Sequence, residues 1–550
     1  MTDTTSQVVA AMIQQRRYVD VLSFVPSDDS LNCYDAVQAA LTAGYGREIV
    51  FGNPYNGQRT YRFTDRSDGR LVMPQKASIR WDTGALCDWT GWGTAGTGTA
   101  YMYAEGDFDA ALTLTQDAAQ GTRTVTMPSG AGSLFSPGDE FVLNSTELLN
   151  PMDPAHPNTI GEWLTVSSVD GDEVTTTTRL KYDYAISGGT VKVHRGDALC
   201  DIRLENPQIK GAGLLDGTNT RGDRGIEIIN SRYVKVTDGR VRESDSYSLL
   251  ITNSYKAHVS KFSSVKTQPT PSGDTRTRYG VSPAGVSSIF RIDGCDFEGG
   301  TEQVALTLTG EITGPKDNVL VTACRMQGAE RSGLTTHHAY RNLSVEGNEF
   351  FDCNQAADLR LGGRFNDNFV QSTGAGLGNL DCAVQIGSGS GPLFASGNVF
   401  DDVLRGYWMS EHIDHWRTPQ DISILNDRMT NVRGQGVLLN FNGANGALDG
   451  DLGTLTVKAD IHLVATGFPR GLWSRGRWKN ADIDLTVRGG NASARSVYME
   501  RPEDSTSLTD GAIDPIITVR QESAMLPPLV QYLANGGGSE TITTQKFGNP

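Results

Sequence analysis

The chain has 550 residues and a formal net charge of −16, and this acidity argues against a nucleic-acid partner, which would need a basic surface. No apolar run reaches transmembrane length, and the first residues show no secretory signal, so we predict no membrane insertion. The seven cysteines are odd in number and lack zinc-finger spacing, which predicts reduced thiols, no metal and no cofactor.

Residues 18–103 begin the folded part of the chain, after a leader predicted at residues 1–17. Strand-like alternation opens this segment, and a helical pattern follows it. Ser30 or Asn32 can cap the N-terminus of the predicted helix. The apolar face of that helix carries Tyr34, Val37, Ala40 and Leu41. Because the open end of a stacked β structure is a sticky edge, we expect the helix to cover it.

Residues 104–196 have a different pattern, in which short apolar alternations are joined by turns. Asp170-Gly171-Asp172 marks a hairpin between two of these strands. We predict a small inserted β domain. A structural module that packs on the rest of the chain is the favoured interpretation, and a sugar-binding module is the alternative.

Residues 197–442 repeat one pattern: apolar, any, apolar, four spacers, apolar. It begins with Ile202-x-Leu204 then Ile209, and it ends with Ile422-x-Ile424 then Met429. Such self-similarity marks a solenoid, in which each turn buries its apolar face on the next. We therefore predict an all-β fold, a parallel β-helix. The alternative, a β-propeller, needs hairpin-linked strands that these irregular loops do not supply.

Small or polar side chains recur three positions after the middle apolar residue of a repeat, where they suit the inside of a bend. They are Cys295, Cys324, Asn348, Asn398 and Asp427. The intervals 236–292 and 345–395 are each wide enough to hide one degenerate turn. Residues 443–550 keep a looser strand spacing, which predicts further turns of the helix followed by a flexible end.

The segment RYVDVL to REIVF, at residues 17–51, resembles the N-terminal cap of pectate-lyase-like β-helix proteins, especially bacteriophage tailspikes. A first strand, an acidic turn, a DAVQAAL helix and an IVF strand follow in the family's order. LVMPQKASIRWDTGA, at 71–85, is similar to the family's next stretch. Ser27-Asp28-Asp29-Ser30 stands where the family usually has Gly-Asp-Gly.

The resemblance implies a right-handed helix and a homotrimer in which residues 443–550 pack three subunits together. It also implies synthesis in a host cytoplasm and assembly into a virion with other phage tail proteins. The expected partner is a bacterial surface polysaccharide, such as a capsule, O-antigen or exopolysaccharide. The predicted function is its recognition and degradation, with hydrolysis as the favoured reaction.

Glycoside hydrolysis needs two carboxyl groups roughly 5 to 10 Å apart, a distance that one or two turns of a β-helix span. The candidate catalytic acids are Glu302, Glu330, Asp352 and Asp358. The candidate substrate contacts are Arg331, His337, Arg360, Tyr407 and Trp408. We expect Glu302 and Glu330 to lie in the loops between the second and third strands of adjacent turns.

Several alternatives stay open from the residues alone. Any single acid is more often a solvated loop residue than a catalyst. Asp293 and Glu346 form a competing acidic pair. A lyase would use His337 or Tyr340 as the base, with Arg360 neutralising a uronate carboxylate. A receptor-binding adhesin without turnover and a lyase or epimerase of plant or algal uronans are further alternatives.

Overall fold

The computed structural model describes residues 18–28, 30–53, 57–65, 69–92, 99–148, 159–196, 199–213, 222–268, 278–307, 310, 312–337, 340–360, 362–371, 382–386, 392–409, 421–440, 452–464, 467–475, 478–500, 516–531 and 541–547. The predicted leader at 1–17 lies outside these residues. The chain divides into an N-terminal unit, Met1–Leu148, Thr159–Thr301 and Thr307–Lys316, and a C-terminal unit, Leu149–Asn158, Glu302–Leu306 and Asp317–Pro550.

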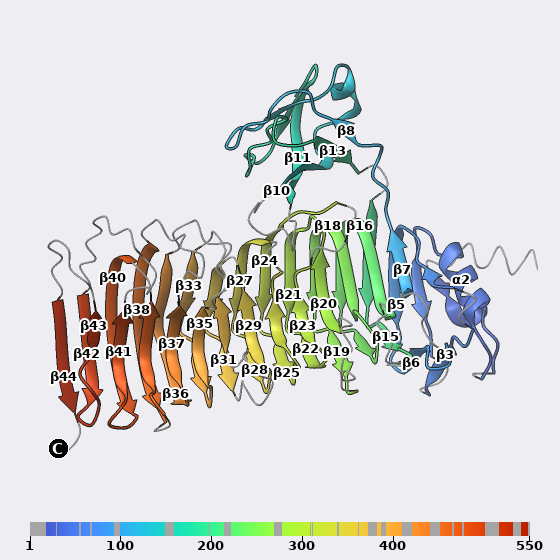
Figure 1. Ribbon diagram of the computed structural model, residues 1–550. Coiled ribbons are helices and arrows are strands. Elements are labelled where there is room, and N and C mark those ends of the chain that lie inside the picture. Colours follow the sequence, from blue (N-terminus) through green and yellow to red (C-terminus); the bar gives the residue numbers. More distant parts are fainter. Residues whose placement is uncertain are drawn as a thin grey trace, which may run out of the picture. The chain divides into compact units, whose positions relative to one another are not determined.

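The N-terminal unit stacks its parallel strands in three columns (Figure 1). The first column runs β1 (Tyr18–Asp20), β2 (Glu48–Phe51), β5 (Lys76–Trp81), β14 (Cys200–Glu205), the later parts of β16 (Arg224–Thr237) and β18 (Leu249–Ser260), and β21 (Ser288–Asp293). The second runs β3 (Arg59–Arg62), β6 (Ala85–Asp88), β15 (Gln208–Lys210), β17 (Arg240–Arg242), β19 (Ser263–Lys266) and β22 (Asp296–Gly299). The third runs β4 (Leu71–Val72), β7 (Ala100–Glu105), the first parts of β16 and β18, and β20 (Tyr279–Ala284).

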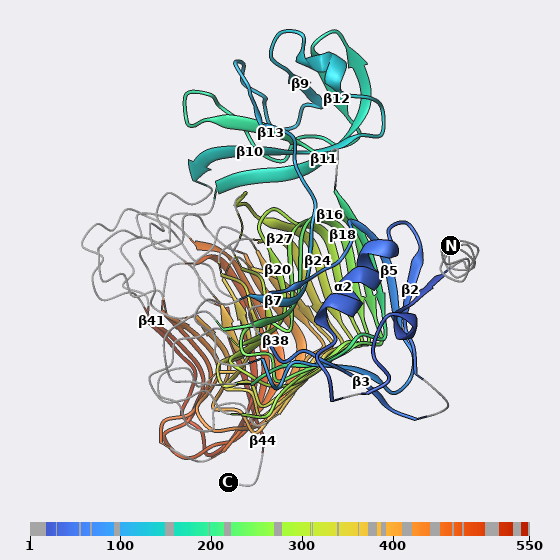
Figure 2. The same cartoon turned by 90° about the vertical axis from the view of Figure 1, so that its right-hand side faces the viewer.

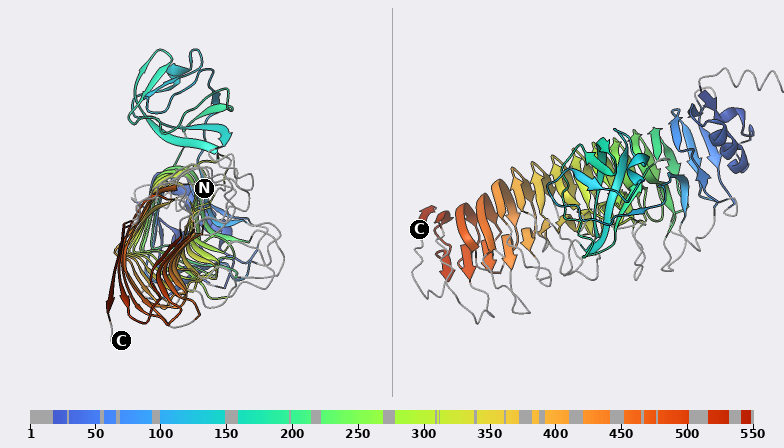
Figure 3. Two further views of the ribbon diagram at one scale, coloured as in Figure 1. Left: turned by 60° about the vertical axis from the view of Figure 1, so that its left-hand side comes forward. Right: turned by 90° about the horizontal axis from the view of Figure 1, so that it is seen from above.

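The C-terminal unit also stacks its strands in three columns, and its later strands are orange to red in Figure 3. The first column is β24 (Lys316–Thr322), β27 (Tyr340–Glu346), β30 (Gly363–Asn366), β33 (Leu393–Ser396), β36 (Ile422–Val432), β38 (Leu452–Leu463), β40 (Trp478–Gly489), β42 (Ile516–Glu522) and β44 (Thr541–Phe547). The second is β25 (Arg325–Gln327), β28 (Glu349–Phe351), β31 (Phe369–Gln371) and β34 (Val399–Asp401), which pairs with the end of β36. The third is β23 (Glu302–Ala305), β26 (Ser332–Thr335), β29 (Gln355–Leu359), β32 (Val384–Ile386), β35 (Arg405–Met409), β37 (Gln435–Asn440), β39 (Arg470–Arg475), β41 (Arg495–Glu500) and β43 (Leu529–Gln531).

The fold is a right-handed parallel β-helix, which confirms the predicted class and rules out the propeller. The two turns that the sequence pattern hid are both present. Val259 pairs between Val236 and Ile292 in the N-terminal unit. Phe365 pairs between Val345 and Ala395 in the C-terminal unit, so each supplies the inward apolar residue that its interval lacked.

The predicted cap helix is α2 (Tyr34–Ala43), which follows the 3-10 turn η1 (Val21–Ser23) (Figure 2). Val37, Ala40 and Leu41 of its predicted apolar face are buried, and Tyr34 is half-buried. Gln38 exchanges two hydrogen bonds with the backbone of Val72 at 2.8 and 3.0 Å. Cys33, not Ser30 or Asn32, occupies the cap position and makes no side-chain cap. No helix in the described ranges has the length and apolar character needed to cross a bilayer.

The predicted inserted β domain is a six-stranded antiparallel sheet within the N-terminal unit, with a short 3-10 turn η3 (Ala131–Leu134). Its strands are β8 (Leu112–Thr113), β9 (Thr124–Thr126), β10 (Glu140–Leu148), β11 (Thr159–Asp170), β12 (Glu173–Thr176) and β13 (Val191–Arg195). Gly171 has a φ of +59° in the predicted hairpin. Trp163 packs against Val286 of the β-helix, and its Nε1 donates to the carbonyl oxygen of that residue at 2.8 Å.

The predicted flexible end is in part a strand. The glycines at 536–538 lie outside the described residues, whereas β44 pairs in parallel with β42 along its length. The open edge of β42 offers a row of backbone hydrogen-bonding groups, and β44 satisfies them.

A buried ladder of amides runs through the bends between the first and second columns of the C-terminal unit. Asn348 Oδ1 accepts from the backbone N–H of Cys324 at 2.9 Å, and Asn368 Oδ1 accepts from Asn348 at 2.9 Å. Asn398 Oδ1 and then Asp427 Oδ1 continue the series at 3.0 and 2.8 Å. The sequence pattern predicted these positions except Asn368, which lies in one of the hidden turns. Each side chain replaces a backbone partner that the bend removes.

Asp427, at the end of the ladder, makes stability depend on pH. Burial raises the pKa of its carboxyl to about 6, from an ordinary value of 3.8. Between these values the folded chain keeps a proton that the unfolded chain has lost, so stability decreases as pH rises through this window. We expect Asp427→Asn to abolish the contribution of this residue to the decrease in stability at higher pH. The amide retains an acceptor for Asn398 and carries no charge.

The measurement is thermal unfolding of wild type and Asp427→Asn at about pH 4.5 and about pH 7.5, where the difference between the two proteins cancels the other titrating groups. The variant should gain stability relative to wild type at the higher pH. An equal pH dependence in both proteins would contradict the assignment.

Candidate active site

The third column of the C-terminal unit aligns two rows of mostly polar side chains, one on either side of its inward positions. In β26, two neighbouring residues point inward, Gly333 and Leu334. A Cβ on Gly333 would meet the ring of Phe350, and Leu334 is fully buried. The residues on either side of this inward pair form the two rows. One row starts Glu302, Ser332, Gln355, and the other starts Ala305, Thr335, Asp358, Gln385, Trp408.

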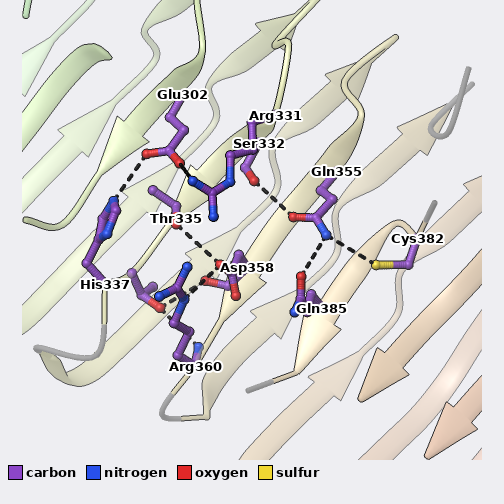
Figure 4. A network of polar contacts seen from close by, with 11 residues as sticks. Glu302, Arg331, Ser332, Thr335, His337, Gln355, Asp358, Arg360, Cys382 and Gln385 are labelled. Carbon is purple, nitrogen blue, oxygen red and sulfur yellow. Dashed lines mark hydrogen bonds and ion pairs between the residues drawn. The ribbon is translucent and has the colours of Figure 1, made fainter. Parts of the chain in front are cut away.

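Glu302 is the first residue of β23, rather than a loop residue as predicted, and it is 0% exposed. Its Oε2 lies 3.2 Å from Nε2 of His337, and its Oε1 lies 3.4 Å from Nη1 of Arg331 (Figure 4). A buried charge is costly unless it is paired, and these two side chains offset that cost.

Asp358 lies on β29, two turns after the strand of Glu302, and it is 3% exposed. Its Oδ2 accepts from Nε of Arg360 at 2.9 Å and from Oγ1 of Thr335 at 3.5 Å. Oγ1 of Thr336 donates to the carbonyl oxygen of Asp358 at 2.9 Å and accepts from the N–H of Arg360 at 3.0 Å. These contacts hold the carboxylate and its arginine in one geometry.

Each carboxylate keeps one oxygen without a hydrogen bond. Oε1 of Glu302 and Oδ1 of Asp358 are both shielded from solvent, and neither has a hydrogen-bond partner among the described residues. Buried polar atoms of folded proteins are nearly always satisfied, so each such exception calls for a ligand, a bound water or a catalytic role. Two of them in one cluster make this the candidate site.

Between the two acids lies a ladder that the sequence analysis missed. Ser332 Oγ donates to Oε1 of Gln355 at 3.0 Å, and Nε2 of Gln355 donates to Oε1 of Gln385 at 2.7 Å and to Sγ of Cys382 at 3.6 Å. The signal that could have found it is the polar residue at the start of successive third-column strands. These hydrogen bonds hold the polar side chains beside Asp358 in place.

The other two predicted acids are placed differently. Glu330 is half-buried in the turn before β26, next to Arg331. Asp352 is exposed in the turn after β28, with a left-handed φ of 50°, and its N–H donates to the carbonyl oxygen of Gln371 at 3.1 Å. Asp402 and Asn431 repeat this conformation in later turns, and Asp residues tolerate it better than most, so the turn itself accounts for Asp352.

Tyr407 was predicted to contact substrate, and the structure corrects this. Its side chain is 0% exposed, and its hydroxyl donates to Asp427 inside the helix. The reason is that Tyr407 occupies the inward register position of its strand, in line with Val384. Trp408, the next residue, belongs to the row of Asp358, and the guanidinium of Arg405 lies 5.3 Å from its ring centroid.

The competing groups are engaged locally. Asp293 forms an ion pair with Arg291 at 3.3 Å, and Ser344 donates to Glu346. Tyr340, the alternative base of a lyase, is buried and donates its hydroxyl to the carbonyl oxygen of Gly362 at 2.6 Å. Among the alternatives for a base, His337 is therefore favoured over Tyr340.

A second acidic cluster, also missed in the sequence, lies in the N-terminal unit. Glu227 is buried and paired with Arg224, and burial raises the pKa of its carboxyl. On the paired strand β7, the hydroxyl of Tyr103 donates to Glu105. This cluster is the rival location for acid–base chemistry. In the described parts of both units, no group of three or more His, Cys, Asp or Glu side chains has a geometry that could hold a metal.

The structure is similar to three solved phage tailspikes, with 14–15% sequence identity. They are gp49 of Pseudomonas phage LKA1 (TM-score 0.52, covering 93% of this chain and 77% of that one) and gp61 of Pseudomonas phage phi297 (0.52, 97% and 81%). The third is gp54 of Acinetobacter baumannii bacteriophage AP22, solved in complex with A. baumannii capsular saccharide (0.51, 94% and 80%). The chain has the tailspike fold. No protein-family model and no curated protein matches the sequence.

Proposed function

We propose that this protein is a phage tail protein that binds and hydrolyses a bacterial surface polysaccharide. The observation that carries the proposal is the pair of buried carboxylates, Glu302 and Asp358, each in an ion pair with an arginine and each with one oxygen that accepts no hydrogen bond from a described residue. The tailspike fold supports it, as does the saccharide bound to one protein of that fold. Fold by itself does not assign an activity, so the proposed activity depends on the residues of the site.

The proposed roles follow from the partners of each acid. Arg360 is closer to its carboxylate and less exposed than Arg331, so Asp358 is the more firmly oriented of the two acids, and we assign it the role of base or nucleophile. Glu302, whose Oε2 lies 3.2 Å from Nε2 of His337, is assigned the role of the acid that donates a proton to the glycosidic oxygen. Two turns place the strands of the two acids roughly 10 Å apart along the stack, and the acids also lie in different rows. This spacing exceeds that of retaining enzymes and favours inversion, where the carboxyl groups leave room for a water.

The test is incubation of the purified protein with capsule or lipopolysaccharide from a susceptible strain. We expect new reducing ends without absorbance from unsaturated uronates. Unsaturated products would instead support a lyase in which His337 is the base. Binding without either product would support an adhesin. Asp358→Asn is the matched variant, and it should bind the glycan but cleave it at least about 100-fold more slowly.

We also propose that the protein forms homotrimers and is part of the virion, attached to other tail proteins, after synthesis in the host cytoplasm. These proposals rest on the resemblance and on the shared fold. Light scattering of the purified protein, which would return three times the 59.3 kDa chain mass, tests the trimer.

A further inference from the structure

From Arg405 and Trp408 onward, the two polar rows of the third column change in composition: one contains mainly arginines and the other mainly aromatic residues. The row that began with Glu302 becomes Arg405, Gln435, Arg470 and Arg495. The row of Asp358 becomes Trp408, Leu438, Trp473 and Tyr498. We call these eight residues the arginine–aromatic strip. All of them belong to the C-terminal unit, and strand register alone brings them into line.

Within the strip, arginines of one row lie over aromatic rings of the other. The guanidinium of Arg470 is 4.3 Å from the ring centroid of Trp473 and 4.6 Å from that of Tyr498. Arg495 lies 5.8 Å from the ring of Tyr498. Ring faces attract cations through their quadrupole and carry no net negative charge of their own.

The hydrogen bonds of the strip leave its charge uncompensated at two positions. Nε of Arg405 donates to Oε1 of Gln435 at 3.0 Å, and Nη1 of Arg495 donates to the carbonyl oxygen of Pro527 at 2.7 Å. Both acceptors are neutral, and neither arginine forms an ion pair with a described residue. A chain with a net charge of −16 thus carries, in one row, two arginines that form no ion pair with a described carboxylate.

Guanidinium groups bind carboxylates through two parallel hydrogen bonds, and indole rings stack on the apolar faces of sugars. Arg405 and Arg470 are two turns apart, as are Trp408 and Trp473, so each pair repeats at roughly 10 Å. That interval is close to the length of a disaccharide. An acidic sugar at every second position would meet an arginine and a tryptophan each time.

From this match we infer that the strip binds a polysaccharide with carboxylate groups, such as uronic or other acidic sugars, whose chain runs along the stack. The inference rests on the proposed function and names its substrate class, because Trp408 shares its row with Asp358 two turns earlier. A glycan held on the strip therefore continues into the candidate active site. The net charge of the chain is negative, but salt screens distant charges, so the local charge decides binding at short range.

The experiment uses the full chain and an array of purified bacterial capsular polysaccharides, one group with carboxylate sugars and one neutral group. We expect wild type to bind members of the acidic group. Arg405→Gln with Arg470→Gln should weaken that binding about 30-fold or more, because two charge-assisted contacts are lost. Reduction of the glycan carboxyls to alcohols should weaken wild-type binding to a similar degree.

The control removes two positive charges elsewhere in the same unit. Lys458 and Arg488 lie on β38 and β40 and pair with Asp482 and Asp460. Lys458→Gln with Arg488→Gln should leave binding unchanged. Wild type that prefers neutral polysaccharides, or that is indifferent to carboxyl reduction, overturns this inference and leaves the proposed function standing. Wild type that neither binds nor cleaves any polysaccharide overturns both.

Discussion

Glu302→Gln should lower polysaccharide cleavage by about 10²- to 10⁴-fold while glycan binding and thermal stability stay close to wild type. The amide has the same shape and can still hydrogen-bond to His337, but it cannot exchange a proton. Because Glu302 is completely buried and the charge of Arg331 is half-exposed, water can solvate the arginine once its partner is neutral. The measurement is the rate of reducing-end release at saturating and limiting glycan.

Three matched variants make this result specific. Glu349→Gln changes an exposed acid on β28 and should be silent. Glu330→Gln tests the acid that the sequence placed in the same cluster, and we expect a small effect, since it lies in the turn before β26. Glu227→Gln tests the rival cluster. Normal turnover in Glu302→Gln with loss of cleavage in Glu330→Gln would make Glu330 the acid. The same result with Glu227→Gln would place the active site at the cluster of Glu227.

Asn368→Leu should destabilise the protein by about 3 to 6 kcal/mol, because leucine fills the space but satisfies no hydrogen bond. Asn368 accepts from the N–H of Asn348 at 2.9 Å and donates to the carbonyl oxygen of Val345 at 3.0 Å. Both backbone groups would be left buried and unpaired. Urea unfolding or, where unfolding is irreversible, the rate of thermal inactivation would measure the loss.

Asn480→Leu is the control for the ladder, since Asn480 is exposed on β40 of the same unit. A surface change of this kind should alter stability by no more than about 0.5 kcal/mol. If both variants unfold alike, the buried amides would not stabilise the bends as we infer.

The prediction of the fold succeeded because the inward residues of a solenoid obey a rule that is local in sequence. Each turn must present apolar side chains at the same register, so residues such as Val236, Ile292 and Val345 mark turns without knowledge of their neighbours. The same rule failed to find Asn368 directly. Its turn is shortened, and the repeat was noticed there only as a wide interval.

The site was harder to predict, because a side chain belongs to it only if it lies at the right place in the sequence and also points to the right side of its strand. Arg331, His337 and Glu302 were chosen as neighbours, and the structure does bring them into contact. Tyr407 was misassigned because one step along a strand decides between core and surface. Asp352 adopts a left-handed turn conformation that no apolar pattern reports.

What the sequence by itself determined is therefore the stack: the period, the apolar register and the capping helix all follow from short-range patterns that each turn must repeat to bury its own face. Only the tertiary structure decided which charges meet. Arg405, Arg470 and Arg495 are far apart along the chain, and their loops differ in length, so their alignment into one row comes from hydrogen-bonded register between turns. A polar row of this kind is invisible in sequence because the outer surface carries no packing requirement to make it periodic.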